Sequence, residues 1–261
     1  MHWKLSFFTS TLCSLFALVG TSSMAQEELP SAQELLAQSV RHHDPQGRWR
    51  TLKTEFLFAW RDTSVVQIDL PRQYFSLQGK LETHEVTSTQ CEFAYERNGK
   101  PQTSNEFIAV DDERCERSTF MRNYVTYLTG LPMKLQDPGT QLRDEVILVD
   151  LLQPINTRAV GALSRKQSQL LQEQGHTSLL KITVDYAKGE NTETWDFFLK
   201  PETKQLVHYQ FYRSDDPAGG EYLILSGLLN LDGVNVIQKR DWYYRKDDKY
   251  LGTEQNLLQL N

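Results

Sequence analysis

Two clusters in this sequence combine histidine or carboxylate groups that could do chemistry. His42, His43 and Asp44 follow one another near the start, and Asp247 and Asp248 are adjacent near the end. Histidine nitrogens and carboxylate oxygens suit zinc or iron, and the same groups can act as acid and base. Neighbouring residues on a helix, however, point about 100° apart, so His42 and His43 cannot easily grip one ion. The sequence therefore predicts no metal site.

Other catalytic patterns are missing from the sequence. It contains no Gly-x-Ser-x-Gly nucleophile motif and no glycine-rich loop of the kind that binds phosphates or dinucleotides. We therefore expect no catalytic residue and no cofactor, and favour a non-enzymatic protein. The alternative is a hydrolase of the cell envelope that uses His43, Asp247 and Asp248 as acid and base, and it requires a pocket that holds all three.

The first 25 residues have the layout of a secretory signal. Lys4 precedes an apolar run over residues 5–20, which is too short to span a bilayer, and Ser23 and Ala25 stand at the small-residue positions of a cleavage site. We predict cleavage after Ala25 and a mature chain of residues 26–261. Such a chain would be periplasmic or secreted.

Net charge and cysteine content indicate which partners and which covalent bonds to expect. The chain has a formal net charge of −6, and the predicted signal removes one basic residue and no acidic one. A negative protein is a poor partner for nucleic acid or for an anionic membrane surface. Cys91 and Cys115 are the cysteines of the mature chain, and an oxidising compartment favours a disulfide between them, worth about 3 kcal/mol. We expect a monomer without a transmembrane segment.

Three segments have patterns that bear on helix formation. Residues 32–40 carry apolar side chains at helical spacing after Ser31, a capping residue, and the helix should end at Asp44, before a proline. Residues 111–127 repeat aromatic and apolar side chains every three or four positions, which predicts a second helix. Residues 165–176 are polar, and we interpret them as a loop or weak helix.

Most of the remaining chain alternates apolar and polar residues. This period of two recurs between residues 52 and 95 and again between residues 180 and 244, with turn residues at intervals. Consecutive strands without intervening helices indicate an antiparallel meander. We predict a mainly β fold with a single domain over residues 26–261. It would be one large curved antiparallel sheet, or half-open β-barrel, with helices covering its concave face.

Six stretches of the chain resemble an uncharacterised family of exported bacterial proteins, a domain of unknown function. They are residues 43–49 (HDPQGRW), 68–75 (IDLPRQYF), 121–128 (MRNYVTYL), 130–140 (GLPMKLQDPGT), 220–227 (GEYLILSG) and 242–253 (WYYRKDDKYLGT). The family has no established activity, so the resemblance implies none.

The architecture is also similar, more distantly, to periplasmic lipoprotein carriers of the LolA/LolB type. The similarity lies in a leading helix that ends in a histidine-containing turn, followed by Trp49 and consecutive antiparallel strands. This resemblance implies a half-open barrel whose apolar concave face is closed by helices. Fold analogy alone does not establish a function.

Our leading hypothesis is that the protein binds an apolar or lipid-like ligand, such as a lipid or a lipoprotein. An apolar cavity between a curved sheet and an aromatic helix could hold such a ligand. The ligand-binding residues that we predict are aromatic or basic: Trp49, Arg122, Tyr124, Tyr127, Trp242, Tyr244, Lys249 and Tyr250. Besides the hydrolase, a structural envelope protein that works through an exposed apolar patch remains an alternative.

Overall fold

The structure is a computed structural model that describes residues 29–72, 74–79, 83–86, 94–97, 100–103, 140–153, 161–188 and 191–258. Several predictions fall outside these ranges. They concern the signal over residues 1–25, the disulfide between Cys91 and Cys115, and the helix over residues 111–127 with Arg122, Tyr124 and Tyr127. These remain predictions.

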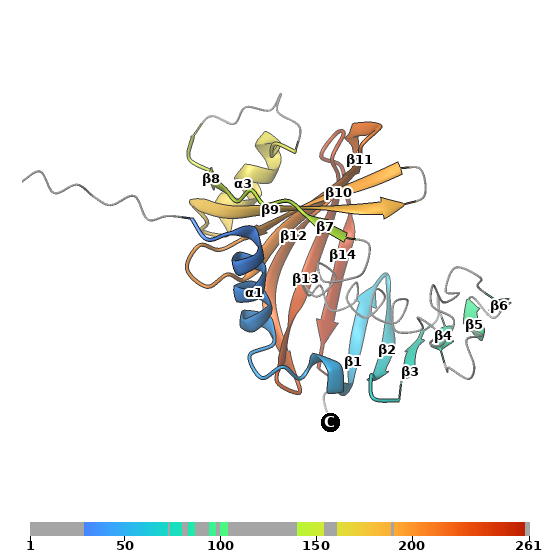
Figure 1. Cartoon of the computed structure of the whole chain (residues 1–261). Coiled ribbons are helices and arrows are strands. Elements are labelled where there is room, and N and C mark those ends of the chain that lie inside the picture. The colour runs from blue at the N-terminus through green and yellow to red at the C-terminus, as the bar shows by residue number, and fades with distance from the viewer. Residues whose placement is uncertain are drawn as a thin grey trace, which may run out of the picture.

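One large antiparallel sheet dominates the described part of the chain (Figure 1). Its strands lie in the order β4-β3-β2-β1-β14-β13-β12-β11-β10-β9-β7, and β8 pairs with β9 beside β7. Their bounds are β1 Lys53–Trp60, β2 Asp62–Asp69, β3 Tyr74–Gln78, β4 Thr83–Val86, β7 Thr140–Leu142, β8 Ile147–Asp150, β9 Ser178–Lys188, β10 Asn191–Leu199, β11 Leu206–Arg213, β12 Asp216–Leu231, β13 Val234–Tyr244 and β14 Tyr250–Leu257. Strands β5 (Ala94–Arg97) and β6 (Lys100–Thr103) form a separate two-stranded sheet. The predicted mainly β fold class, with one large open antiparallel sheet, is confirmed.

Helix α1 (Ala32–His43) begins and ends where the sequence predicts. The hydroxyl of Ser31 accepts a hydrogen bond from the backbone N–H of Glu34, and Asp44 is the C-cap residue. Beyond the helix, both carboxylate oxygens of Asp44 accept backbone N–H groups, from Arg48 and Trp49, at the start of the short 3-10 helix η1 (Trp49–Thr51). These bonds fix the chain's entry into β1.

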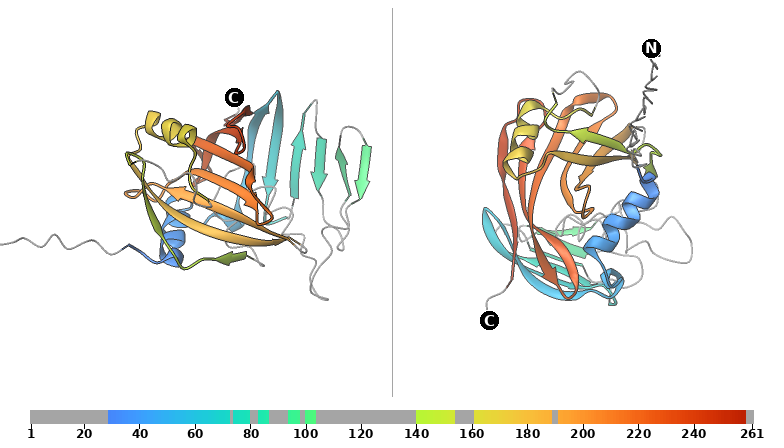
Figure 2. Two further views of the ribbon diagram at one scale, coloured as in Figure 1. Left: turned by 90° about the horizontal axis from the view of Figure 1, so that it is seen from above. Right: turned by 90° about the vertical axis from the view of Figure 1, so that its left-hand side faces the viewer.

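A second helix, α3 (Arg165–Glu173), occupies the segment that we interpreted as a loop or weak helix. Its N-terminus has a complete capping box between Ser164 and Gln167, which the polar composition obscured. The sheet curves around the side on which α1 lies, and α3 lies against the other face (Figure 2). We call these the α1 side and the α3 side.

The core follows this division. On the α1 side there are two clusters of buried side chains, and Val40 of α1 packs against both. One of them contains Leu35 of α1 together with Ile182, Phe197 and Leu223. On the α3 side, Leu171 of the helix packs with a third cluster that contains alternate residues of the same strands. Each strand from β9 to β12 therefore contributes to both cores, as the period of two requires.

Strand β14 joins the two ends of the chain. It pairs with β13 on one edge and with β1 on the other, with Phe58 opposite Asn256. The sequence pattern did not predict this strand, because its inward positions are polar: Glu254 and Asn256 are fully buried. Strand β14 is what makes the N-terminal and C-terminal hairpins one sheet.

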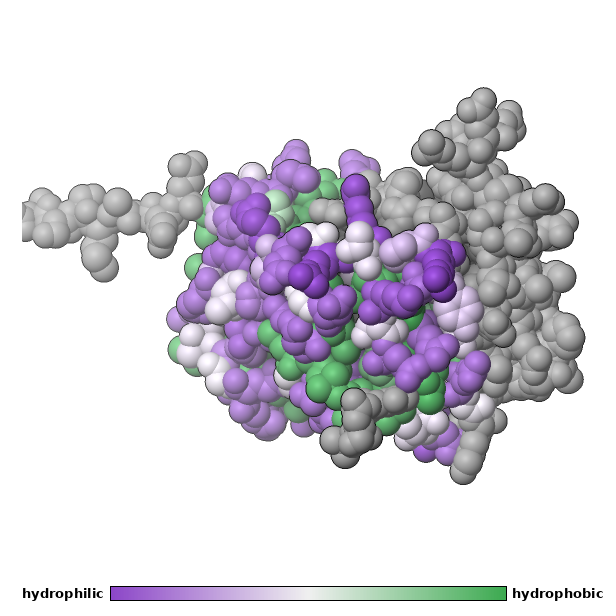
Figure 3. Space-filling view, turned by 90° about the horizontal axis from the view of Figure 1, so that it is seen from below, coloured by the Kyte–Doolittle hydropathy of each residue, from purple (hydrophilic) through white to green (hydrophobic). Residues whose placement is uncertain are grey.

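The surface is not uniformly polar. Seen from below, apolar residues gather in an area bordered by hydrophilic residues (Figure 3). Exposed apolar side chains among the described residues include Leu228 and Leu258. None of the helices in the described ranges is long and apolar enough to cross a membrane.

Candidate functional site

The α1 side carries a cluster of stacked rings that we call the aromatic wall. It consists of Trp195, Phe197, Tyr209 and Phe211, on the neighbouring strands β10 and β11. The ring of Trp195 lies 4.5 Å from that of Phe211, 5.4 Å from that of Tyr209 and 5.9 Å from that of Phe197, with interplanar angles of 17° to 24°. Phe197 and Tyr209 are buried, whereas Trp195 and Phe211 are only partly buried. The wall is continuous with the core beneath α1.

A buried ion pair lies in the same face, on β13 and β14. The Nε of Arg240 donates to Glu254 at 2.8 Å, and the two side chains are only 1% and 0% exposed. The guanidinium also lies 5.7 Å from the ring centre of Phe58. Burial and then the charge of Glu254 raise the pKa of Glu221, and burial raises the pKa of the Tyr209 phenol. This face thus combines aromatic surface with a charged centre.

Next to this pair, Trp60 stacks on Trp242. Their ring centres are 6.5 Å apart and the planes differ by 5°. Trp60, the last residue of β1, is 40% exposed, so a large aromatic surface at this end of the strand reaches solvent. Trp242 is also packed against the core cluster beneath α1.

The predicted ligand-binding residues that the structure describes are divided between the two faces. Trp49 is buried in the core on the α1 side, and Trp242 faces the same side. Tyr250 packs beside Tyr243, whose ring stacks on Tyr222 in the α3-side core. Tyr244 and Tyr250 are exposed, and the backbone of Lys249 forms the turn between β13 and β14. The described side chains of the segment from Trp242 to Tyr250 thus lie on both faces of the sheet.

The three groups of the hydrolase hypothesis are not brought together. His43 is fully buried; its Nδ1 contacts the carbonyl of Asn235 at 2.8 Å, and its Nε2 accepts the N–H of Leu206 at 3.2 Å. Asp247 and Asp248 lie in the turn after β13, beyond Tyr244, so the strand from Asn235 to Tyr244 separates them from His43. At about 3.3 Å per residue this is a separation of about 30 Å.

The His43 contacts define its role as structural. Burial lowers the pKa of His43 to about 4, which keeps the ring neutral while it connects the end of α1 to β11 and β13. Within the described ranges, no three His, Cys, Asp or Glu side chains come together in a way that could hold a metal ion.

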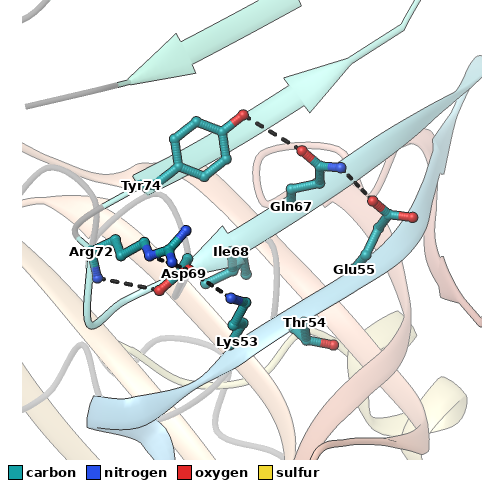
Figure 4. Close-up of a pocket in the computed structure, with 8 residues that line it drawn as sticks. All are labelled: Lys53, Thr54, Glu55, Gln67, Ile68, Asp69, Arg72 and Tyr74. Atoms are coloured by element: carbon teal, nitrogen blue, oxygen red, sulfur yellow. Dashed lines mark hydrogen bonds and ion pairs between the residues drawn. The ribbon is translucent and has the colours of Figure 1, made fainter.

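An open pocket of about 700 Å³ lies on the outer face of β1, β2 and β3 (Figure 4). Asp69, nearly buried, interacts with two exposed cations: its Oδ2 lies 3.3 Å from Lys53 Nζ and 3.6 Å from Arg72 Nε. Beside them, Gln67 donates to Glu55 and accepts from Tyr74. Most of the polar lining side chains, such as Glu55 and Gln67, alternate along the strands with those that enter the α1-side core, whereas Ile68 lines the pocket and also belongs to that core. None of the lining residues belongs to the aromatic wall.

Sequence reasoning missed a buried polar layer on the α3 side. Asp196, His208, Gln210 and Gln167 are each at most 2% exposed and are connected by hydrogen bonds. Burial lowers the pKa of His208 to about 3, so its ring is neutral. The signal that could have found this layer is the Ser164–Gln167 capping pair followed by Leu171, which implies a helix with an apolar side covering these strands.

Comparisons with known proteins identify a family. No curated protein matches the sequence. A solved structure, that of a LolA superfamily protein, NE2245, from Nitrosomonas europaea, is similar with a TM-score of 0.45 and 6% identity. The match covers 89% of this chain and 96% of that one. A likeness at this level says nothing about ligand or activity.

The family assignment rests on the sequence itself. A family model described as a family of unknown function, DUF6503, matches residues 6–149, more than half of the chain. The matched region includes α1, β1 to β3 and the pocket around Asp69. The predicted resemblance to an uncharacterised family is thus confirmed, and the chain belongs to the family of unknown function DUF6503.

Proposed function

We propose that this protein is an exported, non-enzymatic binding protein for an apolar or lipid-like ligand that lies along the aromatic wall on the α1 side. The observation that carries the proposal is the partial exposure of Trp195 and Phe211 at the edge of an otherwise buried aromatic cluster. Aromatic side chains supply large apolar contact area. Ligand sites are mostly apolar, and the Arg240–Glu254 pair on the same face is itself buried, so the accessible part of the proposed site is aromatic.

The curvature of the sheet supports the same proposal. The sheet curves around the α1 side (Figure 2), and side chains from β1 and from β9 to β13 belong to the buried clusters there. A chain-like ligand on this side could therefore contact several strands at once. Trp60 and Trp242 extend the aromatic surface to the opposite part of this face. Cleavage of the predicted signal after Ala25 would place the mature protein in a compartment with membrane lipids.

The experiment is native mass spectrometry of mature protein purified from its own cell envelope, with organic extraction of any bound compound. We expect a lipid or acyl species at one copy per chain. Protein that is empty, and that also takes up no fluorescent fatty acid, would overturn the proposal.

Two variants localise the site. Trp60→Ala removes an exposed ring on the α1 side, and Tyr250→Ala, the matched control, removes an exposed ring on the α3 side. We expect Trp60→Ala to weaken fatty-acid binding about tenfold, equivalent to about 1.4 kcal/mol, and Tyr250→Ala to leave it unchanged. Equal losses in both variants would exclude the aromatic face as the site.

A further inference from the structure

A second, polar cavity lies on the α3 side of β9, β10 and β11, opposite the aromatic wall. It has a volume of about 280 Å³, which is small for an organic ligand site. Its lining is polar except for one proline and the ring of a tyrosine, and it includes Arg143, Lys181, Asp196, Tyr212 and Ser214. A cavity of this size and polarity suits a small hydrophilic group.

The carboxylate of Asp196 forms the floor of the cavity. It is 1% exposed and accepts hydrogen bonds from Thr183 Oγ1 at 2.7 Å, Gln210 Nε2 at 2.9 Å and the Tyr212 hydroxyl at 3.4 Å. These donors use most of its accepting capacity, so Asp196 has little left for a ligand. Its negative charge instead holds the ammonium of Lys181, 3.6 Å away.

Lys181 is therefore a positioned cation. Its side chain is only 13% exposed, and its distance to Asp196 is longer than a hydrogen bond. An ammonium group has three N–H donors. Since Lys181 lines the cavity and Asp196 lies beneath it, those donors are available to a group inside the cavity.

Arg143 is held in the same manner by a second carboxylate. Its Nε and Nη2 donate to the two oxygens of Asp185 at 2.8 and 2.9 Å, and Thr194 donates to Asp185 at 2.8 Å. The hydrogen bond from Arg143 lowers the pKa of Asp185, so the pair stays ionised at neutral pH. The pairing leaves the Nη1 of Arg143 for the cavity.

A third cation lies behind the tyrosine. The guanidinium of Arg245 is 4.4 Å from the ring centre of Tyr212. It donates to the carbonyls of Pro217 and Gly219 and to the side-chain oxygen of Gln210, which are all neutral acceptors. The surroundings of the cavity thus contain three cations and three carboxylates, because Asp216 also acts on Arg245. Asp196 and Asp185 are occupied by the protein donors named above, and Asp216 accepts the N–H of Gly219.

We propose that this cavity binds the oxyanion group, carboxylate or phosphate, of a small molecule. Lys181 and Arg143 supply the charged donors, and the hydroxyl of Ser214 supplies a neutral one. Charge-assisted hydrogen bonds to such a group are stronger than neutral ones. The site is on the face opposite the proposed apolar ligand and does not depend on it.

The test is an NMR titration of the mature protein with inorganic phosphate, and separately with acetate, at constant ionic strength. We expect saturable amide shifts confined to the strands around residues 181, 196 and 212. Lys181→Gln should weaken phosphate binding at least about tenfold, equivalent to about 1.4 kcal/mol. Lys181→Arg, which keeps the charge, should bind phosphate more tightly than Lys181→Gln does. Lys239→Gln is the matched control, since Lys239 pairs with Asp241 elsewhere in the sheet, and should bind as the wild type does.

Arg143→Gln is a second variant that keeps the test informative if Lys181→Gln does not fold. We expect it to fold, because Arg143 is half exposed and its loss leaves Asp185 bonded to Thr194. It should also weaken binding. If neither phosphate nor acetate gave saturable shifts, the proposal would be overturned. Unchanged affinity for the anion in both Lys181→Gln and Arg143→Gln would also overturn it. If binding is confirmed, vesicles of phosphatidylglycerol that displace phosphate would assign the anion to a lipid headgroup, and vesicles without effect would assign it to a free solute.

Discussion

The two faces of strands β9 to β11 are made from alternate residues of the same segments, yet they are stabilised in different ways. Phe197 and Asp196 are neighbours in β10; one joins the apolar core beneath α1 and the other joins the polar layer near α3. Both are almost completely buried. The comparison shows that alternation identifies two faces, but it does not identify which of them is exposed to water.

This difference has an energetic consequence. Apolar burial is roughly proportional to the area removed from water, so its loss is graded. A buried polar group must keep its partners, and the removal of one partner leaves the others unsatisfied. Substitutions on the α3 side should therefore be more damaging, atom for atom, than substitutions on the α1 side.

The largest effect should come from Asp196→Ala. The change leaves Lys181 without its counterion and removes the acceptor for Thr183 and Gln210. We expect a loss of about 3–5 kcal/mol in the free energy of unfolding. Ile182→Val, on the α1 side of the adjacent strand, should cost only about 0.5–1.5 kcal/mol. Urea denaturation measures both, and a cost for Asp196→Ala below that of Ile182→Val would refute the comparison.

Acidification should lower the free energy of unfolding through both faces of the sheet, because each face contains a buried neutral histidine. His43 and His208 have pKa values lowered, chiefly by burial, from 6.5 to about 4 and about 3. The folded state thus excludes a proton that the unfolded chain binds. Their stabilisation is complete above pH 6.5 and is lost as the pH falls towards 4, by up to about 1.4 kcal/mol per pH unit for each histidine.

The pH effect can be divided between the faces by substitution. His43→Gln should remove the part of the pH dependence of stability that comes from the docking of α1. His208→Gln should remove the part that comes from the polar layer. Denaturant midpoints measured from pH 7 to pH 4.5 check this. A wild-type stability that does not change between pH 6.5 and pH 5 would contradict both assignments.

A smaller effect is expected for Gly161→Ala, where the chain closes over the polar layer. Gly161 has a φ of +74°, and an added Cβ would lie 2.7 Å from Asp196 Oδ2 and 2.8 Å from the Tyr212 hydroxyl. Gly175 has a φ of +87°, but a Cβ there would meet nothing within 4 Å. Gly175→Ala should cost the backbone strain, about 1–2 kcal/mol, and Gly161→Ala about 3 kcal/mol because it also displaces hydrogen-bonded groups. Equal costs would mean that the layer adapts freely.

Much of the fold could be predicted from the sequence. The bounds of α1 follow from Ser31 and the Asp44-Pro45 pair, and the apolar positions of β1, β2 and β9 to β11 follow from their alternation. These features are local: each depends on residues within a few positions of one another. The prediction that Trp242 binds a ligand is not of this kind, and it remains a prediction.

What could not be predicted depends on partners that are distant in the sequence. Strand β14 has polar inward residues because Glu254 pairs with Arg240 on the neighbouring strand β13, which no local pattern reveals. The polar residues at alternate positions of β9 to β11 resemble a solvated face until α3 is recognised as their cover. Tyr250 was grouped with Trp242 for its aromatic character, but the turn and the register shift in the β13–β14 pairing place the two on opposite faces.

The smallest expected effect compares the caps of the two helices. Ser31 makes one capping bond, to the N–H of Glu34, and it stands at an exposed helix start. Ser164 accepts from the N–H of Gln167 and donates to Asp248 at 2.8 Å, and Gln167 continues into the polar layer through Gln210. Ser31→Ala should therefore cost about 0.5–1 kcal/mol and Ser164→Ala about 1–2 kcal/mol.

Thermal denaturation of the two variants distinguishes a local cap from one that supports a face. If the α3 cap is part of the polar layer, its loss in Ser164→Ala should be partly non-additive with Gln210→Ala, since the two changes act on one hydrogen-bonded network. Ser31→Ala and Gln210→Ala, which share no partner, should add. Additivity in both pairs would show that α3 covers the polar layer without organising it, and would leave Asp196 and its donors as an independent unit.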